Sequence, residues 1–292
     1  MKFEFVHAER ANYPVAMLCR VLEISRSGYY RWQNAAPSRR QIENQKLKPE
    51  IAAVHEESRK TYGSPRIHAE LVARGYEVGR HRVARLMREL GLSGAFQRRF
   101  RRSPSTGDGH SFGPDLVKRN FRPPAPNRVW ASDISYVKTE QGWVFLAVVL
   151  DLFSRKVVGW AMNRHMRTSM VLDALHRAIG ARDVGEGLIH HSDRGVQFTS
   201  RRFKRHLEEL GIQLSMGETK SCYDNAAVES FFATLKKDLT YRTSFRDLAE
   251  ARSKINAYIN LFYNSQRRHS GLGYLSPIDY ERHHQLEAAS AA

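Results

Sequence analysis

Apolar and polar positions alternate through the middle of the chain in a way that predicts a β-sheet. The strand-like runs, in chain order, are residues 130–137, 143–150 and 157–161. Gln141-Gly142 and Ser154-Arg155 are turn-like connections between them, so we expect an antiparallel meander. The elements that follow are a helix at 169–181, a strand at 188–191, a helix at 200–210, a strand at 212–216 and a helix near 226–239. This order predicts a mixed α/β fold.

The first 96 residues show helical patterns instead. Pro14 suits the first turn of a helix that runs to Leu22, and Ser25 suits the N-cap of a second helix that ends at Trp32. The pair is either a helix-turn-helix or an ordinary helical hairpin. Further helices in this part of the chain are predicted at 51–58, 65–74 and 80–90. Near the C-terminus, a helix is predicted at 245–263, and residues 286–292 are expected to be frayed.

The helix predicted at 80–90 has one apolar stripe. Val83, Leu86, Met87 and Leu90 recur at helical spacing. The candidate DNA-contacting residues on this helix are Arg80, Arg82, Arg85 and Arg88. An arginine-rich face opposite a core stripe is typical of a helix that contacts DNA phosphates or the major groove, and the alternative is a solvated basic face.

A segment rich in Ser, Gly, Pro and Arg follows, and its composition resists packing into a core. Its clustered arginines are Arg98, Arg99, Arg101 and Arg102. They belong to a solvated connector, to a strap along DNA phosphates, or to both. We expect five parts: an N-terminal helical segment at 1–45, a helical domain with the candidate DNA-contacting arginines at 46–96, a basic linker at 97–127, a mixed α/β core at 128–240 and a C-terminal helix and tail at 241–292.

The charge of the chain indicates an anionic partner. The 292 residues carry a net charge of +17. Residues 1–125 hold 24 lysines and arginines against 12 acidic residues, and residues 126–292 hold 23 against 18. Nucleic acid is the simplest partner for such a balance, and we expect the first half to bind it.

The sequence predicts neither a membrane segment nor a disulfide framework. No apolar run approaches the 18 residues of a membrane span, and residues 1–10 lack the apolar core of a signal peptide. Cys19 and Cys222 have no cysteines near them, which argues against a zinc finger and suits a reducing compartment. We expect a cytoplasmic protein with no membrane partner.

Three acidic residues stand where a metal site could form. Asp133 lies in the first predicted strand, Asp193 follows the fourth, and Glu229 lies on the helix near 226–239, with 35 residues between the last two. On a helical wheel, Asn225, Glu229 and Lys236 fall within about 40° of one another at the edge of the buried face. Mg²⁺ prefers a few carboxylate oxygens and keeps positions open for phosphate and water. The alternative is a Glu–Lys pair on a solvated flank.

Two motifs carry a family resemblance. His190–Ser200 and Asn225–Lys236 resemble the catalytic core of DDE transposases and retroviral integrases, and nearly the whole chain resembles the second-reading-frame transposases of bacterial insertion sequence family three. The family pattern is Asp, Asp, 35 residues, Glu, six residues, Lys, which Asp133, Asp193, Glu229 and Lys236 match. The resemblance implies a ribonuclease-H-like core with a mixed five-stranded sheet and helices, preceded by helix-turn-helix-like DNA-binding segments.

The resemblance also implies roles for the residues. Asp133, Asp193 and Glu229 would hold two Mg²⁺ ions, for which Mn²⁺ can substitute. Lys236 would contact the DNA backbone, and Asn225 would orient Glu229 or touch DNA. His190 and His191 are either further ligands or packed side chains.

The implied activity is DNA transposition and integration, by metal-dependent cleavage and strand transfer at the ends of an insertion sequence. The partners would be terminal inverted repeats, target DNA, further copies of the chain on DNA, and a first-frame protein or fusion, in a bacterial cytoplasm at the nucleoid. The alternatives are a DNA-binding regulator with an inactive core and a ribonuclease-H-type nuclease without strand transfer.

Overall fold

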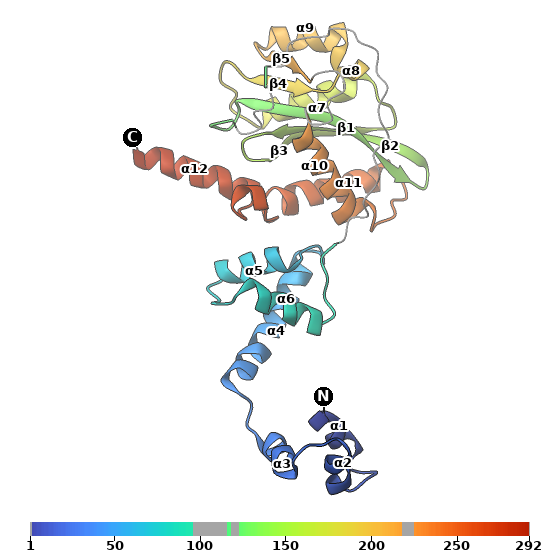
Figure 1. Ribbon diagram of the computed structural model, residues 1–292. Coiled ribbons are helices and arrows are strands. Elements are labelled where there is room, and N and C mark those ends of the chain that lie inside the picture. Colours follow the sequence, from blue (N-terminus) through green and yellow to red (C-terminus); the bar gives the residue numbers. More distant parts are fainter. Residues whose placement is uncertain (1, 96–115, 118–122, 218–224, 292) are drawn as a thin grey trace. The chain divides into compact units, whose positions relative to one another are not determined.

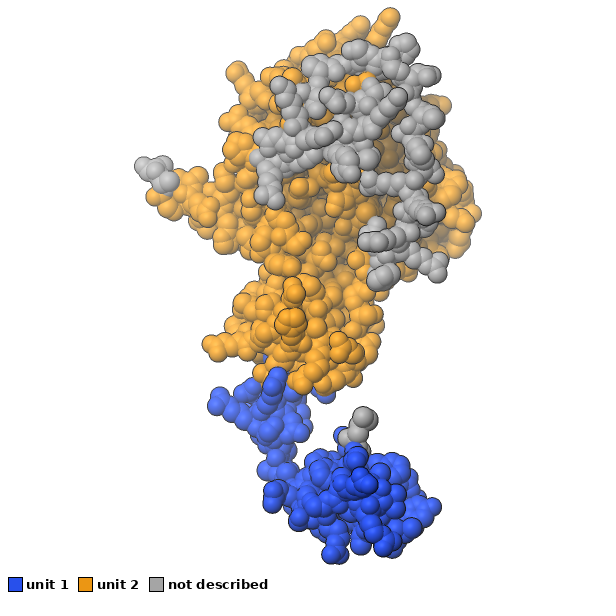
Figure 2. Space-filling model, in the orientation of Figure 1, with its two compact units in different colours: residues 1–53 blue, residues 54–292 orange. Residues whose placement is uncertain are grey.

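The computed structural model describes residues 2–95, 116–117, 123–217 and 225–291. These fall into two compact units, residues 1–53 and residues 54–292 (Figure 2). Helix α4 (Arg39–Glu57) begins in the first unit and ends in the second. The linker arginines Arg98, Arg99, Arg101 and Arg102 lie outside the described residues.

The first unit contains three short helices around a small core. They are α1 (Lys2–Glu9), α2 (Val15–Val21) and α3 (Arg26–Asn34). Val6, Cys19 and Tyr29 are buried together between them. Ser25 caps α3 as predicted, because its hydroxyl accepts a hydrogen bond of 3.0 Å from the Gly28 N–H. Helix α1 was not predicted, because Val6 is its one buried residue among those described and no apolar stripe marks it.

The second unit begins with the helical segment that contains the predicted arginine-bearing helix. It contains α5 (Ser64–Ala73) and α6 (Arg80–Glu89), and α6 buries Val83, Leu86 and Met87 as the stripe predicted. Helix α4 begins at Arg39 rather than at Ile51. Its first half is mostly exposed and has no apolar stripe, so hydrophobic periodicity could not mark that start.

A mixed five-stranded sheet forms the centre of this unit (Figure 1). Its strands are β1 (Val129–Thr139), β2 (Gly142–Asp151), β3 (Val157–Asn163), β4 (Ile189–Ser192) and β5 (Gln213–Met216), in the spatial order β3-β2-β1-β4-β5. The pairs β1–β2 and β2–β3 are antiparallel, which confirms the meander, and β1–β4 and β4–β5 are parallel. This topology confirms the expected ribonuclease-H-like fold.

Helices cover the sheet on one face through a shared apolar core. These helices are α7 (Thr168–Gly180), α8 (Val196–Thr199) and α9 (Arg201–Glu209), whose buried side chains pack with Trp130 and Ala147 of the sheet. Gly159 of β3 allows α7 to approach closely, because a Cβ there would collide with the carbonyl oxygen of Ala174. Helix α8 lies just before the predicted helix at 200–210 and was not expected.

The remaining helices come from the C-terminal part of the chain. They are α10 (Ala226–Leu235), its π-helical continuation η1 (Lys236–Thr240), α11 (Leu248–Tyr258), its π-helical continuation η2 (Ile259–Tyr263), the 3-10 turn η3 (Ser270–Leu272) and α12 (Pro277–Ala291). Helix α10 packs against β1 and β2. Asp238 of η1 and Arg267 form a buried ion pair at 2.7 Å that ties η1 to the segment after η2.

The prediction that residues 286–292 are frayed is wrong as far as Ala291, because α12 continues to that residue. Its first turns are anchored to the core by Glu281, which pairs with Arg182 at 2.8 Å and accepts a hydrogen bond from Ser154 at 2.7 Å. Arg182 also contacts the buried Asp151 at 3.3 Å. Because the first turns of α12 are already held in place, adding further helical residues requires no new nucleation. The helix therefore continues through residues that the sequence predicted to be frayed. No helix among the described residues is both long and apolar enough to cross a membrane.

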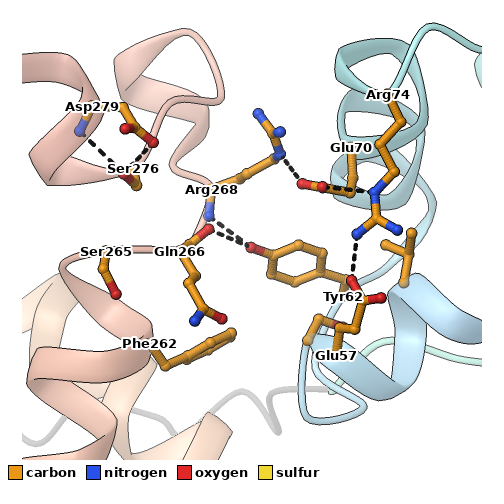
Figure 3. A pocket seen from close by; sticks show the side chains of 12 residues that line it. Glu57, Tyr62, Glu70, Arg74, Phe262, Ser265, Gln266, Arg268, Ser276 and Asp279 are labelled. Atoms are coloured by element: carbon orange, nitrogen blue, oxygen red, sulfur yellow. Dashed lines mark hydrogen bonds and ion pairs between the residues drawn. The ribbon is translucent and has the colours of Figure 1, made fainter.

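The α4–α6 segment is joined to the C-terminal segment by polar contacts (Figure 3). The Tyr62 hydroxyl donates to the carbonyl of Gln266 at 3.3 Å and accepts from the Arg268 N–H at 2.7 Å. The Arg268 guanidinium reaches Glu70 at 2.5 Å. These contacts border a cavity of about 500 Å³ and hold the arginine-bearing helical segment to the C-terminal segment of the same unit.

Candidate active site

Strand β4 ends beside the middle of β1, and this brings two aspartates side by side. The two parallel strands pair through Ser132 and Ser192, and Asp133 and Asp193 are the next residue of each. Neighbouring strands lie about 4.8 Å apart, so the two carboxylates start from adjacent backbone positions. The Ile134 N–H donates to Asp133 Oδ1 at 2.7 Å, and the Gly195 N–H donates to Asp193 Oδ1 at 3.0 Å.

Asp133 projects to the face of the sheet that α10 covers. Side chains alternate along a strand, and Trp130 and Ser132 point into the opposite face, where Ser132 Oγ lies 2.8 Å from His190 Nε2. Helix α10 packs on β1 and carries Glu229 in its first turn. The third acid therefore comes from the element that lies over the first.

Asn225 connects the start of α10 to β1. Its side-chain Nδ2 donates to the Ser132 carbonyl at 3.0 Å, while Asn225 Oδ1 is buried with no hydrogen-bond partner among the described residues. The side chain makes no capping hydrogen bond to α10. The contact fixes the N-terminus of the helix one residue from Asp133, and Glu229 follows one turn later.

The electrostatics place the acids and Lys236 in one group. Burial, together with the charges of Asp193 and Glu229, raises the pKa of Asp133 to about 7, against a lowering by the Ile134 N–H and by Lys236. Burial lowers the pKa of Lys236, and Asp133 opposes that shift. The Lys236 ammonium also lies 5.0 Å from the centre of the Tyr136 ring. Sequence reasoning did not single out Tyr136, and no motif marks it.

The donor set fits a hard divalent cation. Asp133, Asp193 and Glu229 offer carboxylate oxygens, and the raised pKa of Asp133 reflects its burial and the nearby negative charge, which a bound cation would neutralise. No three His, Cys, Asp or Glu side chains within the described ranges already form a closed metal cluster. Catalytic Mg²⁺ needs only one or two carboxylates beside water and phosphate, so an open arrangement suits it.

The two histidines of β4 have structural surroundings. His190 is buried beside Phe198 and Phe203, and burial lowers its pKa to about 3. His191 Nδ1 lies 2.9 Å from Ser215 Oγ of β5. These contacts favour the packed alternative over metal ligation.

The arginines of α6 lie away from its buried stripe. Arg80, Arg85 and Arg88 are exposed and Arg82 is half-buried, while Arg85 lies 3.9 Å from Glu89. The structure therefore separates the arginine face from the core, as the sequence predicted, and DNA contact by that face stays a prediction.

Comparisons with known proteins agree with this architecture. Two family profiles described as "Integrase core domain" match residues 123–222 and 210–277, and one described as "HTH-like domain" matches residues 42–100. The HTLV-2 integrase catalytic core domain in complex with magnesium is a solved structure with 18% identity and a TM-score of 0.43, covering 55% of this chain and 99% of that one.

Curated relatives cover almost the whole chain. The insertion element IS600 uncharacterized 31 kDa protein of Shigella sonnei is 41% identical over 93% of this chain and 100% of its own length. The transposase InsF for insertion sequence IS3A of Escherichia coli (strain K12) is 36% identical over 96% and 98%. Membership of the integrase-core group implies dependence on a divalent metal, and the HTH-like match implies DNA binding. The chain belongs to the IS3 family of insertion-sequence transposases and is a DDE transposase.

Proposed function

We propose that Asp133, Asp193 and Glu229 form the active site of this transposase and hold two Mg²⁺ ions, for which Mn²⁺ can substitute. The observation that carries the proposal is the convergence of three elements: the end of β4, the neighbouring middle of β1, and α10, which Asn225 fixes to the Ser132 carbonyl. When bound, the metals stabilise charge on the attacking and leaving oxygens of the transferred phosphate.

The protein side chains have separate tasks in this scheme. The three carboxylates hold the metals, and the buried position of Asp133 keeps them in a partly water-excluded setting. Lys236 supplies a positive charge for the phosphate backbone near the reacting group. Asn225 orients α10, and through it Glu229, rather than touching DNA, because its Nδ2 is already used by Ser132.

The proposed substrates are the terminal inverted repeats of the element and target DNA. One strand is cleaved to free a 3′-OH, and that hydroxyl then attacks a second strand, so both steps are the same phosphoryl transfer with different nucleophiles. The contacts to DNA outside the active site come from Arg80, Arg82, Arg85, Arg88, Arg98, Arg99, Arg101 and Arg102. Several copies of the chain assemble on DNA, with a first-frame protein or fusion as a further partner, in the bacterial cytoplasm at the nucleoid.

We also propose that the five parts expected from the sequence act in turn on this DNA. Residues 1–45 and 46–96 recognise it, residues 97–127 follow its backbone, residues 128–240 perform the chemistry and residues 241–292 support the core. The contacts of Tyr62 and Glu70 with Arg268 of the C-terminal segment support a fixed path from the arginine face of α6 to the active site.

One assay distinguishes this proposal from its alternatives. Duplex DNA with an element end and a free 3′-OH is incubated with the protein and Mg²⁺, and the products are separated by length. Joined strands support the transposase chemistry proposed for this site. Hydrolysis without joining indicates a nuclease, and binding without any product indicates a regulator with an inactive core.

A further inference from the structure

A second cavity, of about 520 Å³, lies in the unit that contains the sheet. Three segments form it: the end of α4, the turn after α6, and η1 with the two residues that follow. Its lining residues are His55, Lys60, Gly91, Leu92, Ser93, Gly94, Ala95, Lys237, Tyr241 and Arg242. It is separate from the three carboxylates and from the cavity beside Tyr62.

The cavity is basic. Lys60, Lys237 and Arg242 contribute three permanent charges, and none of the described residues that line it is acidic. Lys60 pairs with Glu56 at 3.1 Å, but that carboxylate is not part of the lining. Burial lowers the pKa of His55, and the charges of Lys60 and Arg242 lower it further. The cavity therefore gathers positive charge from two parts of the chain, and no carboxylate of the described residues lines it.

The walls are held in place by backbone contacts. Arg242 donates to the carbonyls of Arg59 at 2.9 Å and Lys60 at 3.4 Å. Both of those residues have positive φ, at 57° and 58°, a conformation that non-glycine residues rarely adopt. The turn after α6 packs so closely that a Cβ on Gly94 would collide with the backbone of Gly63. The basic side chains therefore project from a preformed wall.

The cavity is next to the proposed active site along the chain. Lys236 lies in the electrostatic group of Asp133, and Lys237, the next residue, lines the cavity. Successive residues of a helical segment point about 100° apart, while their Cα atoms are about 3.8 Å apart. One lysine thus faces the carboxylates and the next faces the cavity. Tyr241, 67% exposed, adds an aromatic surface at the same place.

We propose that this cavity binds the phosphate backbone of the DNA strand adjoining the scissile phosphate, an inference that rests on the active site proposed above. Basic side chains from two separate segments suit a chain of phosphates better than one small anion, and the volume exceeds that of a single phosphate group. In this arrangement the DNA strand passes Lys236, then Lys237 and then Lys60, and Tyr241 can stack on a sugar or base.

The test uses the double variant Lys60→Gln and Lys237→Gln, which removes two charges and retains side-chain length. Arg242 is left unchanged because it holds the backbone of the wall. The matched control is Lys204→Gln with Arg205→Gln on α9, which packs on the opposite face of the sheet. Affinity for element-end duplex DNA is measured in EDTA over a range of salt concentrations, after thermal melts have shown that both variants are folded.

The slope of log affinity against log salt concentration becomes shallower by about 0.9 for each phosphate contact that is lost. We expect the slope of the cavity variant to be shallower than that of the wild type by about two, and the slope of the control to be unchanged. Equal slopes for cavity variant and wild type overturn the proposal. Because no cleavage occurs in EDTA, this result is independent of whether the carboxylates act as proposed.

Methylphosphonate groups, which replace a charged backbone phosphate with a neutral group, identify the phosphate that contacts the cavity. They are placed one at a time on the strand beside the scissile position. At one or two positions the neutral group should weaken binding by the wild type and have no further effect on the cavity variant. If inorganic phosphate raises the melting temperature of the wild type alone while no methylphosphonate position distinguishes the two proteins, the cavity is a small-anion site and the DNA assignment is wrong.

Discussion

The buried carboxyl of Asp133 makes a prediction about stability that is independent of catalysis. Asp133→Asn replaces the carboxyl with a neutral group of nearly the same shape, which can still accept the Ile134 N–H. The metal-free variant should be more stable than the metal-free wild type at alkaline pH, although it should be inactive. A site that gathers three acids for metal binding destabilises the fold when the metal is absent.

The magnitude follows from the shifted pKa. The folded-state pKa of Asp133 is about 7 against an ordinary value of 3.8. The folded protein therefore binds more protons than the unfolded chain between these values, and its stability falls as pH rises through that window. Since each pKa unit corresponds to about 1.4 kcal/mol, the stability advantage of the variant should grow by about 2–3 kcal/mol between pH 5 and pH 8.

The measurement is the free energy of unfolding by urea in EDTA at pH 5, 6, 7 and 8, for the wild type, Asp133→Asn and Asp173→Asn. Asp173 is an exposed acid on α7, so its variant removes one negative charge without relieving a buried one. The free energy of unfolding of Asp173→Asn should change with pH in the same way as that of the wild type.

Two results would refute the reasoning. A constant difference between Asp133→Asn and the wild type from pH 5 to pH 8 would show that Asp133 does not titrate near 7. A variant that loses stability relative to the wild type as pH rises would show that Asp133 is stabilised as a carboxylate. At pH 8, Mg²⁺ should reduce the difference in unfolding free energy between Asp133→Asn and the wild type, because it binds and stabilises the wild type alone.

Further predictions concern chemistry, DNA contact and packing. Asp193→Asn should abolish metal-dependent cleavage and joining without weakening DNA binding, and wild-type turnover would exclude its role as a ligand. Lys236→Ala should lower strand transfer strongly and Lys236→Arg should restore part of it, with unchanged melts; full activity of the alanine variant would eliminate the catalytic role. Arg85→Ala with Arg88→Ala should reduce DNA affinity and the salt slope, and an unchanged slope would make α6 a solvated basic face. Tyr62→Phe removes the acceptor of the half-buried Arg268 N–H, so unfolding should cost about 0.5–1.5 kcal/mol less, and an unchanged melting temperature would contradict that contact.

Local patterns predicted the elements that the site depends on. Alternation located β1 to β3, and the spacing of Val83, Leu86 and Met87 gave the buried face of α6. The fifth strand and α10 also lie within a residue or so of their predicted starts. These features follow from which side chains are buried within a single element, and a sequence records that directly.

Features that depend on distant partners could not be predicted. The start of α12 is held by Glu281 and Arg182, which are 99 residues apart, so no local pattern distinguishes it from a frayed tail. Asn225 was left with two possible roles until its contact with Ser132, 93 residues away, favoured one. The basic cavity combines Lys60 with Lys237, and no motif connects them.

The central claim is that Asp133, Asp193 and Glu229 act as one metal-dependent site. The most direct test measures Mg²⁺-dependent joining of element-end DNA by the wild type and by Glu229→Gln, the variant of the acid that α10 supplies. We predict joined product from the wild type and none from Glu229→Gln, with equal DNA affinity and melting temperature for both proteins. Joined product from Glu229→Gln at the wild-type rate would contradict the account.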